Sequence, residues 1–259
     1  MTAILTENKL TPNLEFKLSQ LFQICRQEGS YCPSYPKDGD IFFALKKSES
    51  DSSLAAALIL FHLEEDLWEV VALTHPDFRR KGCFRCLLDA AEAFSPNADF
   101  VFAVPPKTEP AASVLDSIGA QFWYTEHLMA LDSSNMPIFP CKIPDSLSCC
   151  IQWPDGCSTA AGMDISACFY SGQTLTASCR LNFSACTEGS VCCIYQVLVP
   201  ETLRHQGWGF RFFAALLPLL AQKGVLRFVL QVSGDNLPAL ALYKKTGFRI
   251  TETLWYYLY

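Results

Sequence analysis

Residues 191–222, "VCCIYQVLVPETLRHQGWGFRFFAALLPLLAQ", combine an apolar strand, a turn with proline, a glycine-containing loop and an apolar helix. Glycines between a strand and a helix leave backbone N–H groups free of Cβ obstruction, and the start of a helix adds partial positive charge. The stretch therefore predicts a strand–loop–helix unit with a loop suited to phosphate groups. Taken alone, an ordinary surface turn explains the same residues equally well.

The same order of elements occurs earlier, in residues 66–94, "DLWEVVALTHPDFRRKGCFRCLLDAAEAF". A shift of 125 residues places Arg79 on Arg204 and Gly82 on Gly207. Beyond the helix, "ADFVFAV" parallels "LRFVLQV" as a buried strand, and "AASVLDSIGAQF" parallels "ALALYKKTGFRI" as a helix. A repeat of this length indicates two related domains, because the repeats of solenoids are only ~20–50 residues long.

The boundary between the repeats is expected in residues 132–146, which are rich in proline and serine. We therefore predict two domains, 1–137 and 138–259, each with an α/β fold in which helices flank a mixed, largely antiparallel central sheet. A helix expected at residues 14–26 has no counterpart in the second half. Gly119 and Gly247 are predicted to be left-handed caps of helices. Pro218, inside the helix after the loop, predicts a kink or an early helix end.

The composition narrows the class of protein. Half of the 259 residues are hydrophobic, 18% are charged, and the net charge of −6 argues against a nucleic-acid-binding protein. No apolar run reaches the ~20 residues of a membrane span, and no secretion signal is recognised, so a cytoplasmic protein without membrane association is expected. The thirteen cysteines lie mostly in hydrophobic segments of the sequence and are expected to be reduced thiols in the core. The lone C-x-x-C pair, Cys83 and Cys86, has no second pair to complete a zinc site, so no metal is predicted.

A second motif follows in residues 232–248, "VSGDNLPALALYKKTGF". Asn236 has the character of a helix N-cap, and Pro238 is tolerated in the first turn. Tyr243 lies two turns further along the expected helix, and Phe248 follows Gly247. Seen alone, this is an ordinary amphipathic helix whose tyrosine packs in the core.

Residues 197–259 resemble the C-terminal part of the GNAT superfamily of acyl-CoA-dependent N-acyltransferases, and the repeat extends the resemblance, more weakly, to tandem domains. The cofactor motif of that family, Arg/Gln-x-x-Gly-x-Gly/Ala, is matched by Arg204, Gly207 and Gly209. Its second motif, Asn-x-x-Ala-x-x-Leu/Phe-Tyr-x-x-x-Gly-Phe, is matched by Asn236, Ala239, Leu242, Tyr243, Gly247 and Phe248. Two motifs in the right order and spacing are far more specific than either one alone.

The resemblance implies an N-acyltransferase that passes an acyl group, expected to be acetyl, from acyl-CoA to a primary amine by direct attack. Tyr243 would be the catalytic residue that gives a proton to the leaving thiolate, and Asn236 would contact the cofactor or position the helix. The acceptor would be a small molecule or a peptide. The pantetheine arm would lie along Gln196, Val197, Leu198 and Val199. The pyrophosphate of coenzyme A would be held by Arg204, His205, Gln206, Gly207, Trp208 and Gly209.

The chain also departs from this family. Many members carry a glutamate on the strand before the cofactor loop, but residues 190–200 contain no carboxylate, and Glu188 and Glu201 flank them. In the first repeat Phe84 replaces Gly209 and Leu115 replaces Tyr243, so we predict that this copy is degenerate and non-catalytic. The alternative for the whole chain is a non-catalytic module on a GNAT scaffold that binds acyl-CoA or a protein partner.

Overall fold

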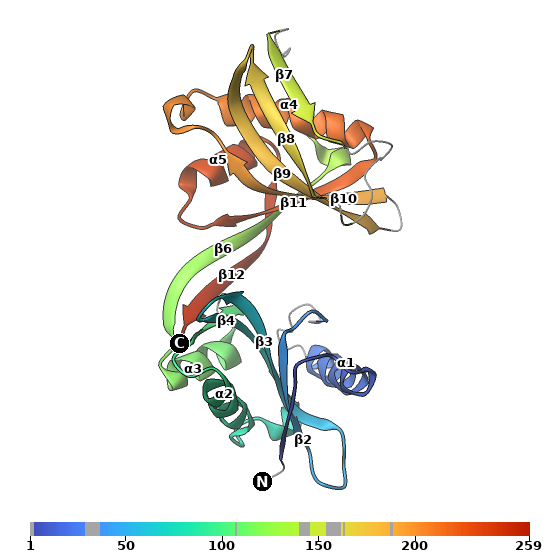
Figure 1. Ribbon diagram of the computed structural model, residues 1–259, viewed down its shortest axis with the longest axis vertical. Coiled ribbons are helices and arrows are strands. Elements are labelled where there is room, and N and C mark those ends of the chain that lie inside the picture. The colour runs from blue at the N-terminus through green and yellow to red at the C-terminus, as the bar shows by residue number, and fades with distance from the viewer. Residues whose placement is uncertain are drawn as a thin grey trace. The chain divides into compact units, whose positions relative to one another are not determined.

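The computed structural model describes residues 3–28, 37–106, 108–139, 146–153, 162, 164–186 and 189–259. The chain divides into two compact units (Figure 1). Unit 1 comprises Met1–Tyr124 with Leu254–Tyr259, and unit 2 comprises Thr125–Thr253. No helix in the described part of the chain is long and apolar enough to cross a membrane.

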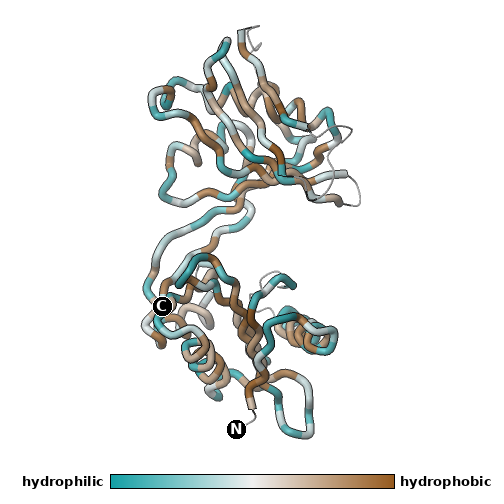
Figure 2. The backbone as a smooth tube through the Cα atoms, viewed as in Figure 1, coloured by the Kyte–Doolittle hydropathy of each residue, from teal (hydrophilic) through white to brown (hydrophobic). Residues whose placement is uncertain are grey.

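Unit 1 has a sheet with helices on both faces. Its strands, in spatial order, are β1 (Ile4–Glu7), β2 (Ile41–Lys46), β3 (Leu54–Glu64), β4 (Leu67–Thr74), β5 (Asp99–Val104) and the end of β12 (Arg249–Leu258). All paired neighbours are antiparallel except β4 and β5. One face packs on α1 (Pro12–Gln27), and the other packs on α2 (Cys83–Phe94) and α3 (Glu109–Ile118). The apolar run that begins β3, brown in Figure 2, is buried between these layers.

Unit 2 is also built on a mixed set of paired strands. Its strands, in spatial order, are β6 (Gln121–Asp132), β11 (Val225–Ser233), β10 (Gly189–Leu198), β9 (Thr174–Cys186), β8 (Asp164–Ser171) and β7 (Leu147–Ile151). Only β10 and β11 pair in parallel. The helices α4 (Trp208–Gln222) and α5 (Leu237–Lys245) contribute to the same core cluster, with α4 against the sheet (Figure 1). Among the described residues of unit 2, no helix covers the opposite face.

The two compact units are not the two continuous halves of the sequence. The end of β12 pairs with β5 inside unit 1, at Trp255↔Val104 to Leu258↔Val101. In turn β6 pairs with β11 inside unit 2, from Glu126 to Asp132. Each compact unit thus receives a strand from the other half of the chain. The division into compact units therefore differs from a boundary between residues 137 and 138, and the two domains 1–137 and 138–259 stay a prediction.

Several local expectations are met. Gly119 and Gly247 adopt positive φ values of 81° and 99° after their helices. Pro218 does not end its helix early, since α4 continues to Gln222. This happens because both flanks of the proline are anchored in the core, at Leu217 and Leu220. Tertiary packing of this kind outweighs the local cost of ~3 kcal/mol that an interior proline imposes.

The cysteines are only partly core residues. All nine described ones are free thiols, and four of them are buried: Cys25, Cys83, Cys179 and Cys192. The expectation of core thiols is therefore confirmed for these four, but it is wrong for Cys150, which is exposed. The alternation of side chains along a strand explains the difference, because neighbouring residues point to opposite faces of the sheet.

Candidate functional site

The parallel strands β10 and β11 separate before β10 ends. Their pairing runs from Ser190↔Val225 to Cys193↔Val229, whereas β10 continues to Leu198. In the described part of the chain, Ile194, Tyr195 and Leu198 pair with β9, and residues 194–198 of β10 have no partner on β11. Such an edge offers backbone N–H and C=O groups to an extended ligand, in the manner of an added strand.

A β-bulge lies in this open segment. Tyr195 faces Arg180 on β9 and Leu198 faces Ser178, so three steps along β10 match two steps along β9. Gln196 takes up the extra residue with a φ of 49°, in the left-handed region. A bulge bends the strand and redirects its backbone groups. It therefore sets Gln196 and Val197, the start of the expected pantetheine segment, apart from the regular ladder.

The predicted loop joins this strand end to α4. A short 3₁₀ turn, η3 (Glu201–Leu203), is followed by two left-handed residues, His205 and Gly207, with φ values of 61° and 80°. Gly207 has open space around its missing Cβ, so its conformation is what favours glycine there. No hydrogen bond to the backbone N–H groups of residues 205–210 is found in the described part of the chain. Consecutive free amides at the start of a fifteen-residue helix form a site suited to an anion.

Arg204 fastens this loop to the strand. Its Nε donates a hydrogen bond to the carbonyl oxygen of Val199 over 3.1 Å, and its Nη1 lies 3.5 Å from Glu201 Oε1. In unit 1, Arg79 Nε donates to the carbonyl oxygen of Thr74 in the equivalent position, over 3.4 Å. In each repeat, therefore, the arginine ties the loop to the end of the preceding strand.

The loop of unit 1 has the same backbone conformation. Arg80 and Gly82 have φ values of 58° and 79°, which match those of His205 and Gly207. The strand before it differs, however. Val71, the counterpart of Gln196, pairs with Ile59 in an unbroken register, so β4 has no bulge there. The first copy thus retains the loop but lacks the bulge.

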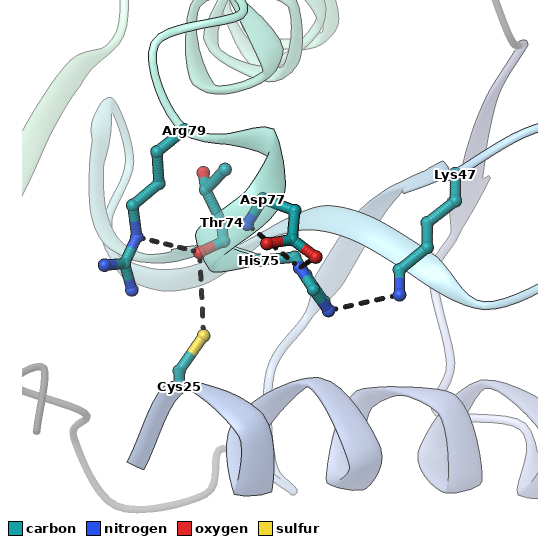
Figure 3. A network of polar contacts seen from close by, with 6 residues as sticks. All are labelled: Cys25, Lys47, Thr74, His75, Asp77 and Arg79. Atoms are coloured by element: carbon teal, nitrogen blue, oxygen red, sulfur yellow. Dashed lines mark hydrogen bonds and ion pairs between the residues drawn. The ribbon is translucent and has the colours of Figure 1, made fainter. Parts of the chain in front are cut away.

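In unit 1, side chains of the unit itself hold the end of β4 (Figure 3). The Thr74 carbonyl oxygen accepts a second contact from Cys25 Sγ on α1, at 3.6 Å. His75 Nδ1 accepts a hydrogen bond from the Asp77 backbone N–H over 3.2 Å, and its Nε2 lies 3.1 Å from Lys47 Nζ. Burial, followed by the positive charge of Lys47, lowers the pKa of His75. These contacts tie α1, the end of β2 and the loop together at the place that corresponds to the open edge in unit 2.

The second motif lies on α5 and in the core of unit 2. The Asn236 side chain caps the helix, because Oδ1 accepts a hydrogen bond from Ala239 N over 3.2 Å. The N-cap prediction is therefore confirmed. Tyr243 is 6% exposed and packs on the rings of Phe213 and Phe248, with centroids 5.6 and 6.1 Å away. Burial raises the pKa of Tyr243 to about 12, so its hydroxyl keeps its proton near neutral pH.

Two neighbours of the loop have structural surroundings that the sequence did not reveal. Gly209 lies where α4 contacts α5, and the space of its missing side chain is taken by Leu242. The indole Nε1 of Trp208 is buried and has no hydrogen-bond partner among the described residues. The guanidinium of Arg211 lies 4.9 Å from the centre of the Trp208 rings.

The structure also brings a carboxylate to β10 that the sequence analysis missed. Arg180 on β9 forms a two-point ion pair with Asp164 on β8, with distances of 3.1 and 2.6 Å. Tyr195 on β10 hydrogen-bonds to both of these side chains. Its bond to Asp164 raises the pKa of Tyr195. The bond from Arg180 lowers the pKa of Asp164. Cross-strand register creates this cluster, and a single strand's sequence carries no signal of it. Glu201 is engaged with Arg204, and Glu188 lies outside the described residues.

Comparison with known proteins agrees with these features. Residues 147–248 match the model of the acetyltransferase (GNAT) family. A stretch of 60 residues is 40% identical to the mycothiol acetyltransferase of Saccharomonospora viridis. That stretch amounts to 23% of this chain and 20% of the relative, so the match spans about a fifth of the relative's length.

Solved structures resemble the whole chain in fold. A GCN5-related N-acetyltransferase from Sphaerobacter thermophilus has 12% identity and a TM-score of 0.72, with 99% of this chain and 95% of that chain covered. A tandem GNAT protein from the clavulanic acid biosynthesis pathway has 13% identity and a TM-score of 0.71, with 99% and 98% covered. A GCN5-related glucosamine N-acetyltransferase region of a fungal multi-domain β-N-acetylglucosaminidase has 12% identity and a TM-score of 0.73, with 100% and 38% covered. The predicted fold class, two tandem GNAT-like α/β domains, is therefore confirmed.

Proposed function

Since residues 147–248 form a domain of the acetyltransferase (GNAT) family, we propose that the protein transfers an acetyl group from acetyl-CoA to a primary amine of a small molecule or peptide. The observation that carries this proposal is the continuity of the open edge of β10, the bulge at Gln196 and the loop at Gly207. One segment thus offers backbone groups for an extended arm and, directly after them, free amides for an anion. A pantetheine joined to a pyrophosphate needs both in this order.

Each segment of the site has its own role in this proposal. Residues 196–199 hold the pantetheine arm through their backbone, and residues 205–209 bind the pyrophosphate. Arg204 keeps the loop on the strand, and Asn236 keeps α5 in position. The neutral amine attacks the thioester carbon, the C–N bond forms, and the C–S bond breaks. The nitrogen releases one proton to water, and water returns one proton to the Tyr243 phenolate after the thiol has formed. Tyr243 gives its proton to the departing thiolate, a role for which a buried and protonated phenol is suited.

In this proposal, unit 1 does not catalyse the reaction. It has the arginine and the left-handed glycine, but it has neither the bulge nor the tyrosine. Leu115 stands in place of Tyr243 and is buried at 3% exposure, and a leucine side chain has no proton to donate. Acetyl-CoA is therefore expected to bind once per chain.

A titration calorimetry experiment with acetyl-CoA tests the cofactor site through its stoichiometry. We expect one site per chain for the wild type. Gln206→Glu adds a negative charge to the exposed loop of unit 2 and is expected to weaken binding about tenfold, a cost of ~1.4 kcal/mol. Lys81→Glu, the matched control in unit 1, makes a larger charge change and should leave the affinity unaltered. Absence of binding to the wild type would refute the cofactor site, and equal losses in both variants would refute its assignment to unit 2.

The alternative function is that of a non-catalytic module that binds acyl-CoA or a protein partner. The lack of a carboxylate on β10 favours this alternative. A turnover assay separates the two. Acetyl-CoA is incubated with a panel of primary amines, including amino sugars because one structural relative is described as a glucosamine N-acetyltransferase region, and free coenzyme A is measured by chromatography. Amine-dependent release that Tyr243→Phe slows supports the enzyme. Binding without release for any amine supports the module.

A further inference from the structure

Two cysteines face each other across the last pair of strands in unit 2. Cys150 on β7 pairs with Cys168 on β8 in the antiparallel register. Each strand turns its other side to the core, where Cys149 packs from β7 and Phe169 from β8. Because side chains alternate along a strand, Cys150 and Cys168 share the opposite face. They are therefore direct cross-strand neighbours on the side that no described helix of unit 2 covers.

The spacing of the two strands suits a bond between these thiols. The backbone bonds Gln152 N to Ser166 O and Gly172 N to Ser146 O mark the hydrogen-bonded pairs of this ladder. In an antiparallel ladder, hydrogen-bonded and non-hydrogen-bonded residue pairs alternate along each strand. Cys150 and Cys168 lie two residues from the pair Gln152 and Ser166, so they also form a hydrogen-bonded pair, whose Cα atoms are ~5.5 Å apart. Disulfides span Cα distances of ~4.4–6.8 Å. The side chains need a small approach, and β7 can supply it because, among the described strands, it is a five-residue edge strand that pairs with β8 alone.

The other described thiols of the region are less suited to reaction. Burial raises the pKa of Cys149 to about 12, and it raises the pKa values of Cys179 and Cys192 as well. Those thiols stay protonated, and a protonated thiol is a poor nucleophile. Cys150 is exposed and Cys168 is half-buried, so an attacking reagent can reach this pair through Cys150.

We propose that Cys150 and Cys168 form a redox-active dithiol that a small-molecule disulfide, such as oxidised glutathione, converts reversibly into a cross-strand disulfide. The Cys150 thiolate attacks one sulfur of the small disulfide, and one small thiol leaves. The Cys168 thiolate then attacks Cys150 Sγ in the mixed disulfide, and the second small thiol leaves. In sum, the protein loses two electrons and two protons, and one small disulfide becomes two thiols. The product bonds the edge strand β7 covalently to β8.

The test treats the full-length reduced protein with oxidised glutathione and analyses it by mass spectrometry, before and after proteolysis. We expect a product two hydrogens lighter than the reduced chain and one crosslinked peptide pair that contains Cys150 and Cys168. Dithiothreitol should restore the original mass, because a disulfide in a hydrogen-bonded, exposed position is readily reduced. A crosslink between other cysteines, or no mass change, would overturn the proposal.

Single variants distinguish the pair from two independently reactive thiols. Cys150→Ser and Cys168→Ser leave one partner without the other, so the remaining thiol should stop at the mixed disulfide and gain the mass of one glutathionyl group. Cys193→Ser, on the same face but on β10, is the matched control and should still form the crosslink. A wild type that accumulates glutathionyl groups on both Cys150 and Cys168 would show that the thiols do not meet.

Discussion

A Cβ atom at Gly209 would lie 2.9 Å from Leu242 Cδ2, so the last glycine of the loop lets the Leu242 side chain of α5 pack closely on the start of α4. Both residues belong to the family motifs recognised in the sequence, one to each motif. In the sequence, this glycine is expected because it leaves backbone N–H groups free of Cβ obstruction for a phosphate. The structure gives an additional reason within the protein itself, because the two motif helices pack together at this point.

Gly209→Ala is expected to destabilise unit 2 by about 1 kcal/mol. The added methyl group overpacks the helix contact at a cost of ~1–3 kcal/mol, and the higher helix propensity of alanine returns up to ~1 kcal/mol. Urea unfolding measures the change. Leu242→Ala makes room for the methyl group, so in the double variant the effect of Gly209→Ala should disappear or change sign. Strictly additive losses in this double-mutant cycle would contradict the contact.

Arg204→Ala and Arg79→Ala form a matched pair of substitutions. Each removes a guanidinium that donates to the carbonyl oxygen five residues before it, Val199 or Thr74. The Arg204 side chain is 52% exposed, so we expect its loss to cost only ~0.5–1 kcal/mol in urea unfolding. Arg79 also hydrogen-bonds to Cys25, so Arg79→Ala should cost more.

The affinity for acetyl-CoA should fall more in Arg204→Ala than in Arg79→Ala, which is the reverse of the order expected for stability. Arg204→Ala frees the loop of unit 2 and is expected to weaken binding several-fold in calorimetry. Arg79→Ala lies in the copy without the bulge and should leave the dissociation constant within twofold of the wild type. A well-folded Arg79→Ala protein with the larger loss of affinity would place the cofactor site in unit 1.

The parts of the fold that depend on local sequence could be predicted. Asn236 caps α5 and Gly247 follows it because both roles need only a residue type and a few neighbouring backbone groups. The strand–loop–helix order around Gly207 was recognisable for the same reason. The repeat made this prediction firmer, since Gly82 adopts the same left-handed conformation.

The parts that depend on register or on distant strands could not be predicted. The bulge at Gln196 exists only relative to β9, and the Arg180–Asp164–Tyr195 cluster requires the alignment of three strands. The exchange of β6 and β12 between the two compact units has no local signal at all. Hydrophobic alternation shows that a strand has an inner face, but it does not identify the neighbour against which the strand will lie.

The stability of unit 1 is expected to fall when His75 becomes protonated. Burial and Lys47 hold its pKa below the ~6.5 of a free imidazole, while Asp77 and Glu28 oppose and Arg79 reinforces this shift. The unfolded chain therefore binds the proton more readily than the folded one. The stabilisation is fully present above about pH 6.5 and is lost as the pH falls through the lower folded pKa.

His75→Asn isolates this contribution in urea unfolding between about pH 5 and about pH 7.5. Asparagine is a good N-cap, so it can still accept the hydrogen bond from Asp77 N but does not titrate. We expect the difference in unfolding free energy between wild type and variant to narrow toward low pH. A difference that stays constant over this range would mean that His75 does not change its charge there.

Tyr243→Phe is expected to lower kcat by about tenfold to a hundredfold, because general-acid assistance to a leaving thiolate is lost. The ring stays packed on Phe213 and Phe248, so affinity for acetyl-CoA and the unfolding free energy should change little. The pKa of about 12 means that the wild-type phenol remains protonated, so its rate should not decline between about pH 8 and about pH 10 through loss of this proton. Tyr170→Phe, on the opposite face of the sheet, is the control and should keep full activity. A Tyr243→Phe protein with wild-type kcat would refute the role of this hydroxyl as the proton donor, while leaving the cofactor site to be judged by the calorimetric stoichiometry.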